Sequence, residues 1–322
     1  MKFNIRNISA YFLAIFLIAF GFVRRARERA LRGEYIINLC FHHPGKREFE
    51  ACIMWLKKHG FTILSLDDLY TILYQKLPFP KGGVVLTADD GWQSNEANIV
   101  EVATRYQVPV TIFVSTEPVE EGAYWWSYIQ KARKLKLKVM PVKELKLLAN
   151  ASRLRVVEEA KTIVAPFREA MTVEQVKRVA DSNYVTIGGH THTHPVLVNC
   201  GIEELYNELT VSRARLEGWV GKEVSYFAYP NGDFGEREKL ALKDSNYKLA
   251  FTIRAEYLRA DSIVDPYTLP RFCFLEGASF AENVCRMCGI WHPLIHKIKS
   301  LLPVRRGYKV NAPDHRTILS SP

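Results

Sequence analysis

Short apolar segments alternate with amphipathic segments along most of the chain. Runs of β-branched, aromatic and other apolar residues predict buried strands at 35–41, 61–64, 84–88, 109–114, 185–189, 224–229 and 249–253, and 269–274 closes the body. Apolar positions at helical spacing predict helices at 47–59, 66–77, 94–106, 202–219 and 235–246. Strands that alternate with helices build parallel sheets, so the pattern predicts an α/β protein with a parallel sheet or barrel.

One segment, residues 117–170, interrupts this alternation. It opens with Tyr124-Trp125-Trp126 and continues as a Lys-rich stretch with leucines at helical spacing. We interpret it as a mostly helical insertion on the active-site side of the body. The aromatic residues either form a platform for sugar rings, which makes Trp125 and Trp126 candidate substrate-binding residues, or they are local core.

The N-terminal segment, residues 1–32, is predicted to be a hydrophobic and basic membrane anchor. Residues 8–23 form a nearly continuous apolar run, shorter than the ~20 residues that a helix needs to cross a bilayer. Arg24 and Arg25 follow in place of a small-residue cleavage site, which argues against a cleaved signal peptide. Basic residues after the run favour a cytoplasmic body, and a periplasmic or extracellular body is the alternative.

The C-terminal tail, residues 276–322, contains a second segment of this kind. Residues 290–302 place apolar side chains at helical spacing with His and Lys between them, which predicts a basic amphipathic helix. Such a helix either lies on a membrane surface or packs its apolar face on the body.

The net charge of +10 is concentrated at the two ends. Residues 1–32 hold seven Lys/Arg and one acid, and residues 276–322 hold seven Lys/Arg and three acids. Residues 33–275 are therefore formally neutral, whereas a nucleic-acid enzyme is expected to carry basic surface on its folded body. The distribution predicts no nucleic-acid partner and favours an anionic membrane surface.

Six cysteines are spread along the chain and do not form the framework of a small disulfide-rich protein. Cys285 and Cys288 have CxxC spacing, but neither a second pair nor a nearby histidine completes a zinc site. Unpaired cysteines favour a reducing compartment.

Acidic and imidazole side chains follow two of the predicted strands. Asp89 and Asp90 come after the strand at 84–88, and His190 and His194 follow the strand at 185–189. The acidic pair alone is compatible with simple turn chemistry. With the histidines, however, it predicts a metal site with open positions, suited to zinc, because carboxyl ends of parallel strands meet at one edge. One carboxylate binds the ion and its neighbour stays free as a base, a combination that hydrolyses amides or esters.

Three motifs resemble, in order, the first three motifs of the polysaccharide deacetylase family, the NodB-homology group or carbohydrate esterase family 4. They are Thr87-Ala88-Asp89-Asp90-Gly91, His190-Thr191-x-x-His194-Pro195 and Phe227-Ala228-Tyr229-Pro230-Asn231-Gly232. The resemblance covers about residues 35–275, and we assign 33–275 to this domain. It implies a distorted seven-stranded (β/α) barrel and metal-dependent removal of N-acetyl groups from amino sugars.

The resemblance also implies roles for single residues. Asp89 matches the general base, and Asp90, His190 and His194 match the metal ligands. The Tyr229 region matches the loop whose backbone amide helps to hold the oxyanion. Thr191 matches a residue that steadies the metal loop, and Asn231 and Tyr229 join Trp125 and Trp126 as candidate substrate-binding residues.

The chain departs from the family pattern at three places. Ala88 replaces the usual Phe of the first motif, and Ala228 replaces the Arg of the third, whose task of orienting the base we assign to Arg271 in Leu269-Pro270-Arg271. The late Leu-x-His motif, which supplies the catalytic acid, is not found near residue 270. Leu39-Cys40-Phe41-His42 instead resembles the early Tyr-His motif of a permuted subset, so His42 is the predicted acid; His43, His292 and His296 are the alternatives.

The sequence therefore predicts a membrane-associated N-deacetylase that uses a divalent metal, with zinc favoured. Its predicted substrate is an N-acetylated amino sugar, in a polyprenyl-phosphate-linked or surface-polysaccharide precursor. Two alternatives stay open: an inactive barrel that binds glycans as a scaffold, and a deformylase of a lipid-linked amino sugar.

Overall fold

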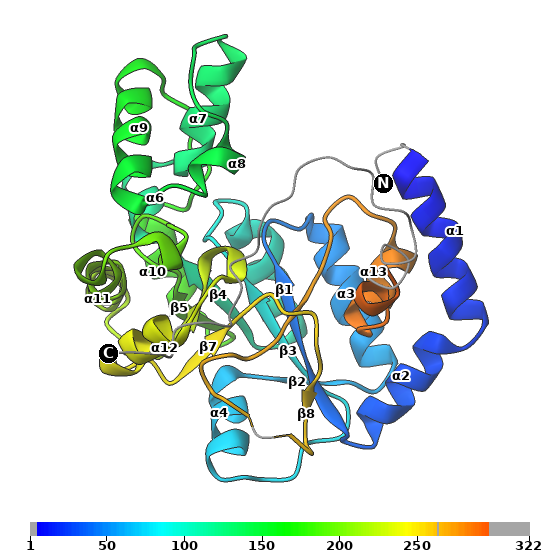
Figure 1. Ribbon diagram of the computed structural model, residues 1–322. Helices are drawn as coiled ribbons and strands as arrows, with labels where there is room; N and C mark the ends of the chain where they lie inside the picture. The colour runs from blue at the N-terminus through cyan, green and yellow to red at the C-terminus, as the bar shows by residue number, and fades with distance from the viewer. Residues whose placement is uncertain (1–4, 263, 296–322) are drawn as a thin grey trace, which may run out of the picture.

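The computed structural model describes residues 5–262 and 264–295 of the chain (Figure 1). Nine strands form one sheet within these residues: β1 (Tyr35–Phe41), β2 (Thr62–Leu64), β3 (Gly83–Ala88), β4 (Val110–Val114), β5 (Val185–Gly189), β6 (Tyr226–Ala228), β7 (Leu249–Phe251), β8 (Leu258–Arg259) and β9 (Phe272–Cys273). The strand order is β7-β6-β5-β4-β3-β1-β8, with β2 paired to β3 and β9 paired to β1. All pairings are parallel except that of β8 with β1.

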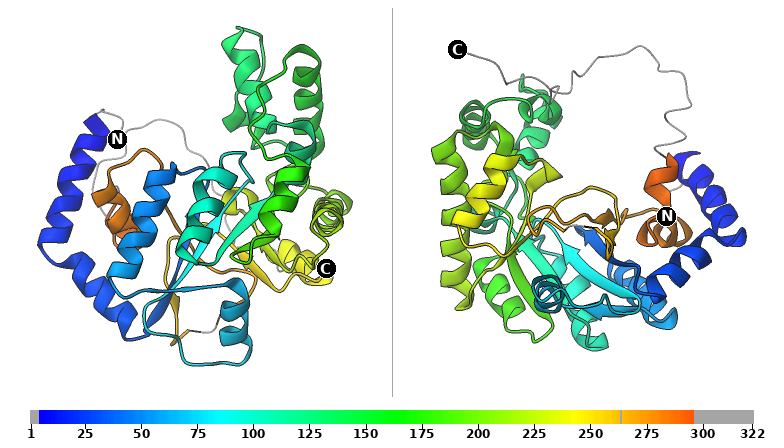
Figure 2. Two further views of the ribbon diagram at one scale, coloured as in Figure 1. Left: turned by 180° about the vertical axis from the view of Figure 1, so that it is seen from behind. Right: turned by 60° about the horizontal axis from the view of Figure 1, so that its bottom comes forward.

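Helices connect and cover these strands (Figure 2). They are α1 (Ile5–Ala19), α2 (Phe22–Leu31), α3 (Lys46–Lys58), α4 (Leu66–Tyr74), α5 (Glu101–Tyr106), α6 (Thr116–Glu121), α7 (Trp125–Lys134), α8 (Val142–Leu145), α9 (Asn150–Ile163), α10 (Val173–Ala180), α11 (Ile202–Val220), α12 (Glu236–Asp244) and α13 (Phe280–Met287). A π-helical turn at Glu96–Val100 precedes α5, and short 3₁₀ turns lie at Leu197–Asn199 and Pro230–Gly232.

The curled parallel sheet confirms the predicted fold class, a distorted (β/α) barrel, here in the form of an open half-barrel. The strands are nearly continuous apolar runs because both of their faces are covered, and every residue of β1, β3 and β4 is buried. At the end of β5 the sheet also packs closely: a Cβ on Gly188 would lie 2.4 Å from the Phe113 ring, and one on Gly189 would lie 2.5 Å from the Tyr247 hydroxyl. Only glycine fits at these two positions.

The parallel arrangement gathers the ends of several strands at one edge of the sheet. His42 follows β1, Asp89 and Asp90 follow β3, and His190 follows β5. Arg271 immediately precedes β9, whose Cys273 pairs with Cys40 of β1. The sheet therefore brings residues as distant in sequence as Cys40 and Cys273 to one place.

The segment between β4 and α10 contains four helices, α6 to α9, of which α7, α8 and α9 project from the body beside the open edge of the sheet (Figure 1). Its apolar side chains form a small separate core, which includes Trp125, Ile129, Leu145 and Val157. We call residues 116–163 the helical insertion.

The N-terminal helices α1 and α2 meet at a bend of 59°. Helix α1 packs its small side chains, Ala10 and Ala14, against α13, and Arg6 forms an ion pair with Glu282. Within the described part of the chain, no helix taken singly has the length and apolar character needed to cross a membrane, whereas α1 and α2 counted together reach that limit.

The predicted helix at 290–302 falls mostly outside the described residues. In the part that is described, residues 291–295 are helical, Trp291 is buried, and Leu294 and Ile295 pack against the core of the body. Cys285 and Cys288 of α13 are also buried, in reduced form, in this core.

Candidate active site

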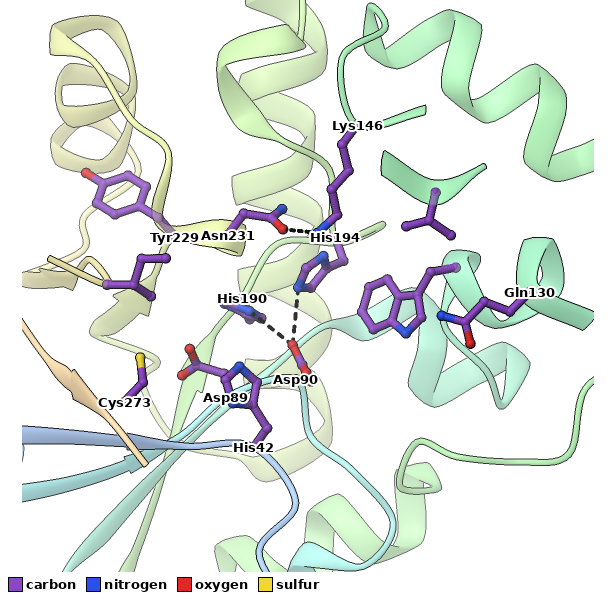
Figure 3. Close-up of a pocket in the computed structure, with 13 residues that line it drawn as sticks. His42, Asp89, Asp90, Gln130, Lys146, His190, His194, Tyr229, Asn231 and Cys273 are labelled. Atoms are coloured by element: carbon purple, nitrogen blue, oxygen red, sulfur yellow. Dashed lines mark hydrogen bonds and ion pairs between the residues drawn. The ribbon is translucent and has the colours of Figure 1, made fainter. Parts of the chain in front are cut away.

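Asp90, His190 and His194 form a compact buried cluster at the carboxyl ends of the strands (Figure 3). Asp90 Oδ1 lies 3.4 Å from His190 Nε2 and 3.2 Å from His194 Nε2. The second oxygen of Asp90 accepts a hydrogen bond from Trp92 Nε1 at 2.8 Å, which leaves Oδ1 facing the imidazoles. His190 Nδ1 donates to the Ala228 carbonyl at 2.7 Å, so its Nε2 carries a lone pair.

These three side chains fit a divalent metal ion. Two atoms that each lie ~2.1 Å from one ion are roughly 3.0 to 3.4 Å apart, the spacing found around Asp90 Oδ1. Burial lowers the pKa of His194 and keeps its imidazole in the neutral form that binds a cation. Burial alone would raise the pKa of Asp90, but the adjacent imidazoles of His190 and His194 outweigh it and hold that pKa well below its usual value.

The loops that carry the cluster adopt backbone conformations that are uncommon outside glycine. Asp90, Thr191 and His194 have φ values of 76°, 69° and 54°. Thr191 Oγ1 accepts a hydrogen bond from the His194 N–H at 3.1 Å and donates to the His190 carbonyl. The predicted steadying residue thus lies between the two histidines and bonds to both of their backbones.

A buried acid from α11 supports the same loop. Glu208 accepts hydrogen bonds from the backbone N–H groups of His192 and Thr193, each at 2.8 Å, and from Thr193 Oγ1 at 2.7 Å. Arg153 of the helical insertion donates to Thr193 Oγ1 at 2.9 Å. Our sequence analysis missed Glu208, although an acid on the apolar face of a helix, three residues after Leu205, was a usable signal.

Asp89 is held by a fully buried arginine, Arg271. Nη1 and Nη2 of Arg271 each lie 2.7 Å from one oxygen of Asp89, a bidentate pair, and Arg271 is also fixed by the Thr252 carbonyl at 2.9 Å. Burial alone would raise the pKa of Asp89, but the charge of Arg271 outweighs it and the pKa is lowered. Arg271 thus contacts both oxygens of the carboxylate that the sequence predicts to be the base.

His42 follows β1 and lines the cavity on the side of Asp89 (Figure 3). Burial alone would lower the pKa of its imidazole, but the nearby carboxylates of Asp90, Asp89 and Glu276 together raise it. A raised pKa favours the protonated form that a general acid requires.

Two thiols lie beside these groups, and the sequence analysis gave them no role. Cys40 donates a hydrogen bond to Asp89 Oδ2 at 3.4 Å, and Cys273 lines the cavity. A hydrogen bond with Cys40 lowers the pKa of Cys273 to about 7.

Tyr229 lines the cavity, but its backbone N–H and its hydroxyl both have partners elsewhere in the fold. Its backbone N–H donates to the Phe251 carbonyl of β7 at 3.0 Å, and its hydroxyl donates to the Tyr267 carbonyl at 3.0 Å. Both hydrogen-bond donors of Tyr229 are therefore bonded to carbonyl groups of the protein, and its ring points away from the Asp90–His190–His194 cluster (Figure 3). Asn231, two residues later in the turn, also lines the cavity and lies closer to the cluster.

The aromatic trio divides between core and cavity. Tyr124 and Trp125 are buried. Trp125 Nε1 donates a hydrogen bond to the His194 carbonyl at 3.0 Å, so Trp125 supports the histidine loop and does not line the cavity. Trp126 lines the cavity, with its ring edge-to-face against His194 at 4.7 Å between centroids. The core interpretation holds for two of the three side chains.

A cavity of about 430 Å³ lies over the cluster, within the range of small-ligand sites. One wall comes from the sheet edge, with His42, Asp89, His190 and Cys273. The opposite wall comes from the helical insertion, which contributes Trp126, Gln130, Val142 and Lys146. No sequence motif marks Gln130 or Lys146, and only the folded chain brings them to the cavity.

The sequence model of one family, described as polysaccharide deacetylase, matches residues 76–250, more than half of the 322 residues. The chain belongs to the polysaccharide deacetylase family. Members of this family are hydrolases that act on amide C–N bonds and depend on a metal ion, and Asp90, His190 and His194 are the candidate metal site of this member.

Several solved deacetylases share the fold. The Streptococcus pyogenes deacetylase PplD, in complex with acetate, aligns with a TM-score of 0.58 and 18% identity over 79% of this chain and 98% of its own. IcaB from Ammonifex degensii aligns with a TM-score of 0.57 and 20% identity over 80% of this chain and 98% of its own. At these identities the likeness concerns the fold.

A relative from Bacillus subtilis (strain 168), YxkH, also bears the name polysaccharide deacetylase. It is 20% identical over 207 residues, which are 64% of this chain and 57% of YxkH. The match therefore spans little more than half of that relative's length.

Proposed function

We propose that this polysaccharide deacetylase is a metal-dependent N-deacetylase that hydrolyses the acetamide of an N-acetylated amino sugar. One observation carries the proposal. Asp90 faces the imidazoles of His190 and His194 at the spacing expected of metal ligands, whereas the adjacent Asp89 is ion-paired with Arg271. The two adjacent carboxylates therefore have different tasks: Asp90 is available as a metal ligand, and Asp89 is available as a base.

Zinc is the ion we favour, because two imidazole nitrogens and one carboxylate oxygen are donors that suit it. Asp90, His190 and His194 would hold it, and when bound it polarises the amide carbonyl and lowers the pKa of water.

The residues around this cluster divide the remaining tasks. Asp89 accepts a proton from the attacking water, and Arg271 keeps that carboxylate ionised and oriented. His42 donates a proton to the amide nitrogen as the C–N bond breaks, which releases acetate and a free amine. Since the N–H of Tyr229 is used by β7, we assign the oxyanion contact to the turn that follows it, at Asn231.

The substrate class follows from the family and the cavity. The S. pyogenes structural relative is a deacetylase that holds acetate, the expected product of this reaction. Trp126 offers this chain's cavity an aromatic surface next to His194, where the apolar face of a sugar ring can rest. We favour a lipid-linked sugar, such as a polyprenyl-phosphate saccharide, because of the N-terminal helices.

The outer surface of α1 supports membrane association. Ile8, Phe12, Ile15 and Phe16 are exposed on it, as is Phe20 in the turn that follows, while its inner face packs on α13. Exposed Arg24 and Arg25 follow in α2 and suit anionic lipid. We propose that α1 lies in one leaflet, with residues 290–302 as a second contact, and that the body is on the cytoplasmic face, the alternative being the periplasmic or extracellular side.

Activity is tested with purified protein on free and lipid-linked N-acetyl sugars, by mass spectrometry and acetate assay. We expect a loss of about 42 mass units, one acetyl group exchanged for hydrogen. Asp89→Asn should bind metal stoichiometrically yet turn over about 10²- to 10⁴-fold more slowly. Metal-loaded protein that releases no acetate from any N-acetyl sugar contradicts the proposal.

Membrane association is tested by sedimentation with anionic and neutral vesicles. Phe12→Ser with Phe16→Ser should reduce binding to both and leave hydrolysis of a soluble sugar unchanged. Phe167→Ser is the matched control, because Phe167 is exposed but belongs to a different surface. Equal sedimentation of the double variant and the control would exclude α1 as the contact.

A further inference from the structure

Lys146 is a cation in the active-site cavity that forms no ion pair within the described part of the chain. It directly follows α8 in the helical insertion, and its side chain points toward His194 and Asn231 (Figure 3). Its ammonium donates a hydrogen bond to Asn231 Oδ1, a neutral acceptor. Among the described residues, no carboxylate lies within ion-pair distance of Lys146 Nζ, although Asp233 and Asp90 act on it from farther away.

A second lysine of the helical insertion, Lys161, has the ion pairs that are typical of a lysine with a structural role. Lys161 Nζ lies 2.7 Å from Glu121, 2.8 Å from Glu158 and 3.4 Å from Glu117. These acids raise the pKa of Lys161, whereas burial lowers the pKa of Lys146. The helical insertion thus pairs one partly buried lysine with several acids and leaves the other, which faces the cavity, without a counterion among the described residues.

Asn231 adds a second unused donor at the same point. Its Oδ1 is occupied by Lys146, and its Nδ2 is buried without a hydrogen-bond partner. The turn fixes this side chain: Asn231 has a φ of 58°, and a Cβ on the following Gly232 would lie 2.3 Å from Ile253. Asn199 Nδ2 donates to the Lys146 carbonyl at 2.8 Å and fixes the lysine from the other side.

We propose that Lys146 and Asn231 form an anion-binding subsite beside the reacting amide, and that the substrate carries a negatively charged oxygen group at that position. This proposal rests on the N-deacetylase function proposed above and narrows its substrate. A phosphate ester on the ring carbon next to the acetamide, or a carboxylate on a neighbouring sugar, supplies the acceptor oxygens that the two donors need.

Matched ligands separate the charge from the sugar. The methyl glycoside of N-acetylglucosamine is neutral, N-acetylglucosamine 1-phosphate carries the phosphate, and a uronate-linked N-acetylglucosamine carries the carboxylate. Binding is measured by calorimetry on metal-loaded protein and turnover by acetate release. We expect wild-type protein to bind at least one anionic ligand about tenfold or more tightly than the neutral one, with a difference that shrinks as salt rises.

Variants then assign the preference to residues. Lys146→Gln should reduce the preference about tenfold and change binding of the neutral ligand less than twofold, and Asn231→Asp should reduce it as well. Lys143→Gln is the matched control, because Lys143 is exposed on the same short helix. The phosphate and uronate ligands show which anion is preferred.

Equal binding of neutral and anionic ligands by wild-type protein overturns the subsite, as does a preference that survives Lys146→Gln. Failure of the N-deacetylase function looks different: the binding preference and its loss in Lys146→Gln persist, while no ligand releases acetate.

Discussion

The two walls of the cavity are built differently. On the sheet wall the two carboxylates and the backbone of the histidine loop have partners within the fold: Asp89 bonds to Arg271, Asp90 to Trp92, and the loop to Glu208. On the insertion wall, Trp126 is half-buried and Gln130 is exposed, and Lys146 lacks a counterion. Groups whose hydrogen bonds and ion pairs are already formed before substrate binds are held in place for the chemical step. Groups that still have free hydrogen-bonding capacity can recognise the substrate. Changes on the first wall should lower kcat, and changes on the second should alter KM or ligand preference.

The largest effect is expected at Asp90. Asp90→Asn removes the only negative charge of the three predicted ligands, so we expect loss of bound metal and activity below detection. Metal analysis and acetate release check this. Asp261→Asn is the matched control, because Asp261 is exposed and lies outside the cluster. If Asp90→Asn retains stoichiometric metal, the ion binds elsewhere, and the assignment of the chemical step to the sheet wall is wrong.

The next effect concerns the pH dependence set by Arg271. Arg271 holds the pKa of Asp89 below its usual value, so the base stays ionised in mildly acidic solution. Arg271→Lys keeps a charge but loses the bidentate geometry, and the pKa of Asp89 should rise. The acidic limb of the kcat profile should therefore move to higher pH, with about 10²-fold lower activity on the acid side and partial recovery as pH rises. An unshifted limb would mean that Arg271 only supports folding.

Trp92 allows a finer test of the sheet wall. Trp92→Phe keeps an aromatic ring and removes the hydrogen bond to Asp90 Oδ2, which frees that carboxylate to rotate. Metal affinity should fall about 10- to 100-fold, while activity at saturating metal changes little. Competition with a chelator measures the affinity. Unchanged affinity would show that the backbone of the turn alone orients Asp90.

The smallest catalytic effect should come from the insertion wall, and two adjacent tryptophans provide the contrast. Trp126→Ala should raise KM about tenfold, equivalent to about 1.4 kcal/mol, with kcat nearly unchanged. Trp125→Ala should instead destabilise the protein by about 3–5 kcal/mol, because it removes a buried side chain. Thermal unfolding and steady-state kinetics separate the two. A similar KM change in both variants, with no loss of stability, would contradict the assignment of Trp125 to the core.

The sheet wall was largely predictable from sequence and the insertion wall was not. Residues that directly follow an apolar strand, such as Asp90 and His190, have their position fixed by the strand, and the strand is visible as an uninterrupted apolar run. Trp125 and Trp126 look alike in sequence, and which one faces the cavity depends on how α7 packs. Lys146 has no local signal at all.

The backbone of Tyr229 shows a related limit. Whether its N–H is free for a substrate depends on the pairing of β6 with β7, a contact between segments about 20 residues apart. Long-range register of this kind leaves little trace in the local pattern.

The segment matched by the family, residues 76–250, omits both His42 and Arg271. It also omits β1 and β2, the neighbours of β3, so a fragment cut at those limits would expose the backbone of β3 to solvent and to other chains. The stretch of this protein that is easiest to recognise is thus not one that could be transplanted as a working unit. Gene fusions or shuffled chimaeras would have to carry the flanking strands with it.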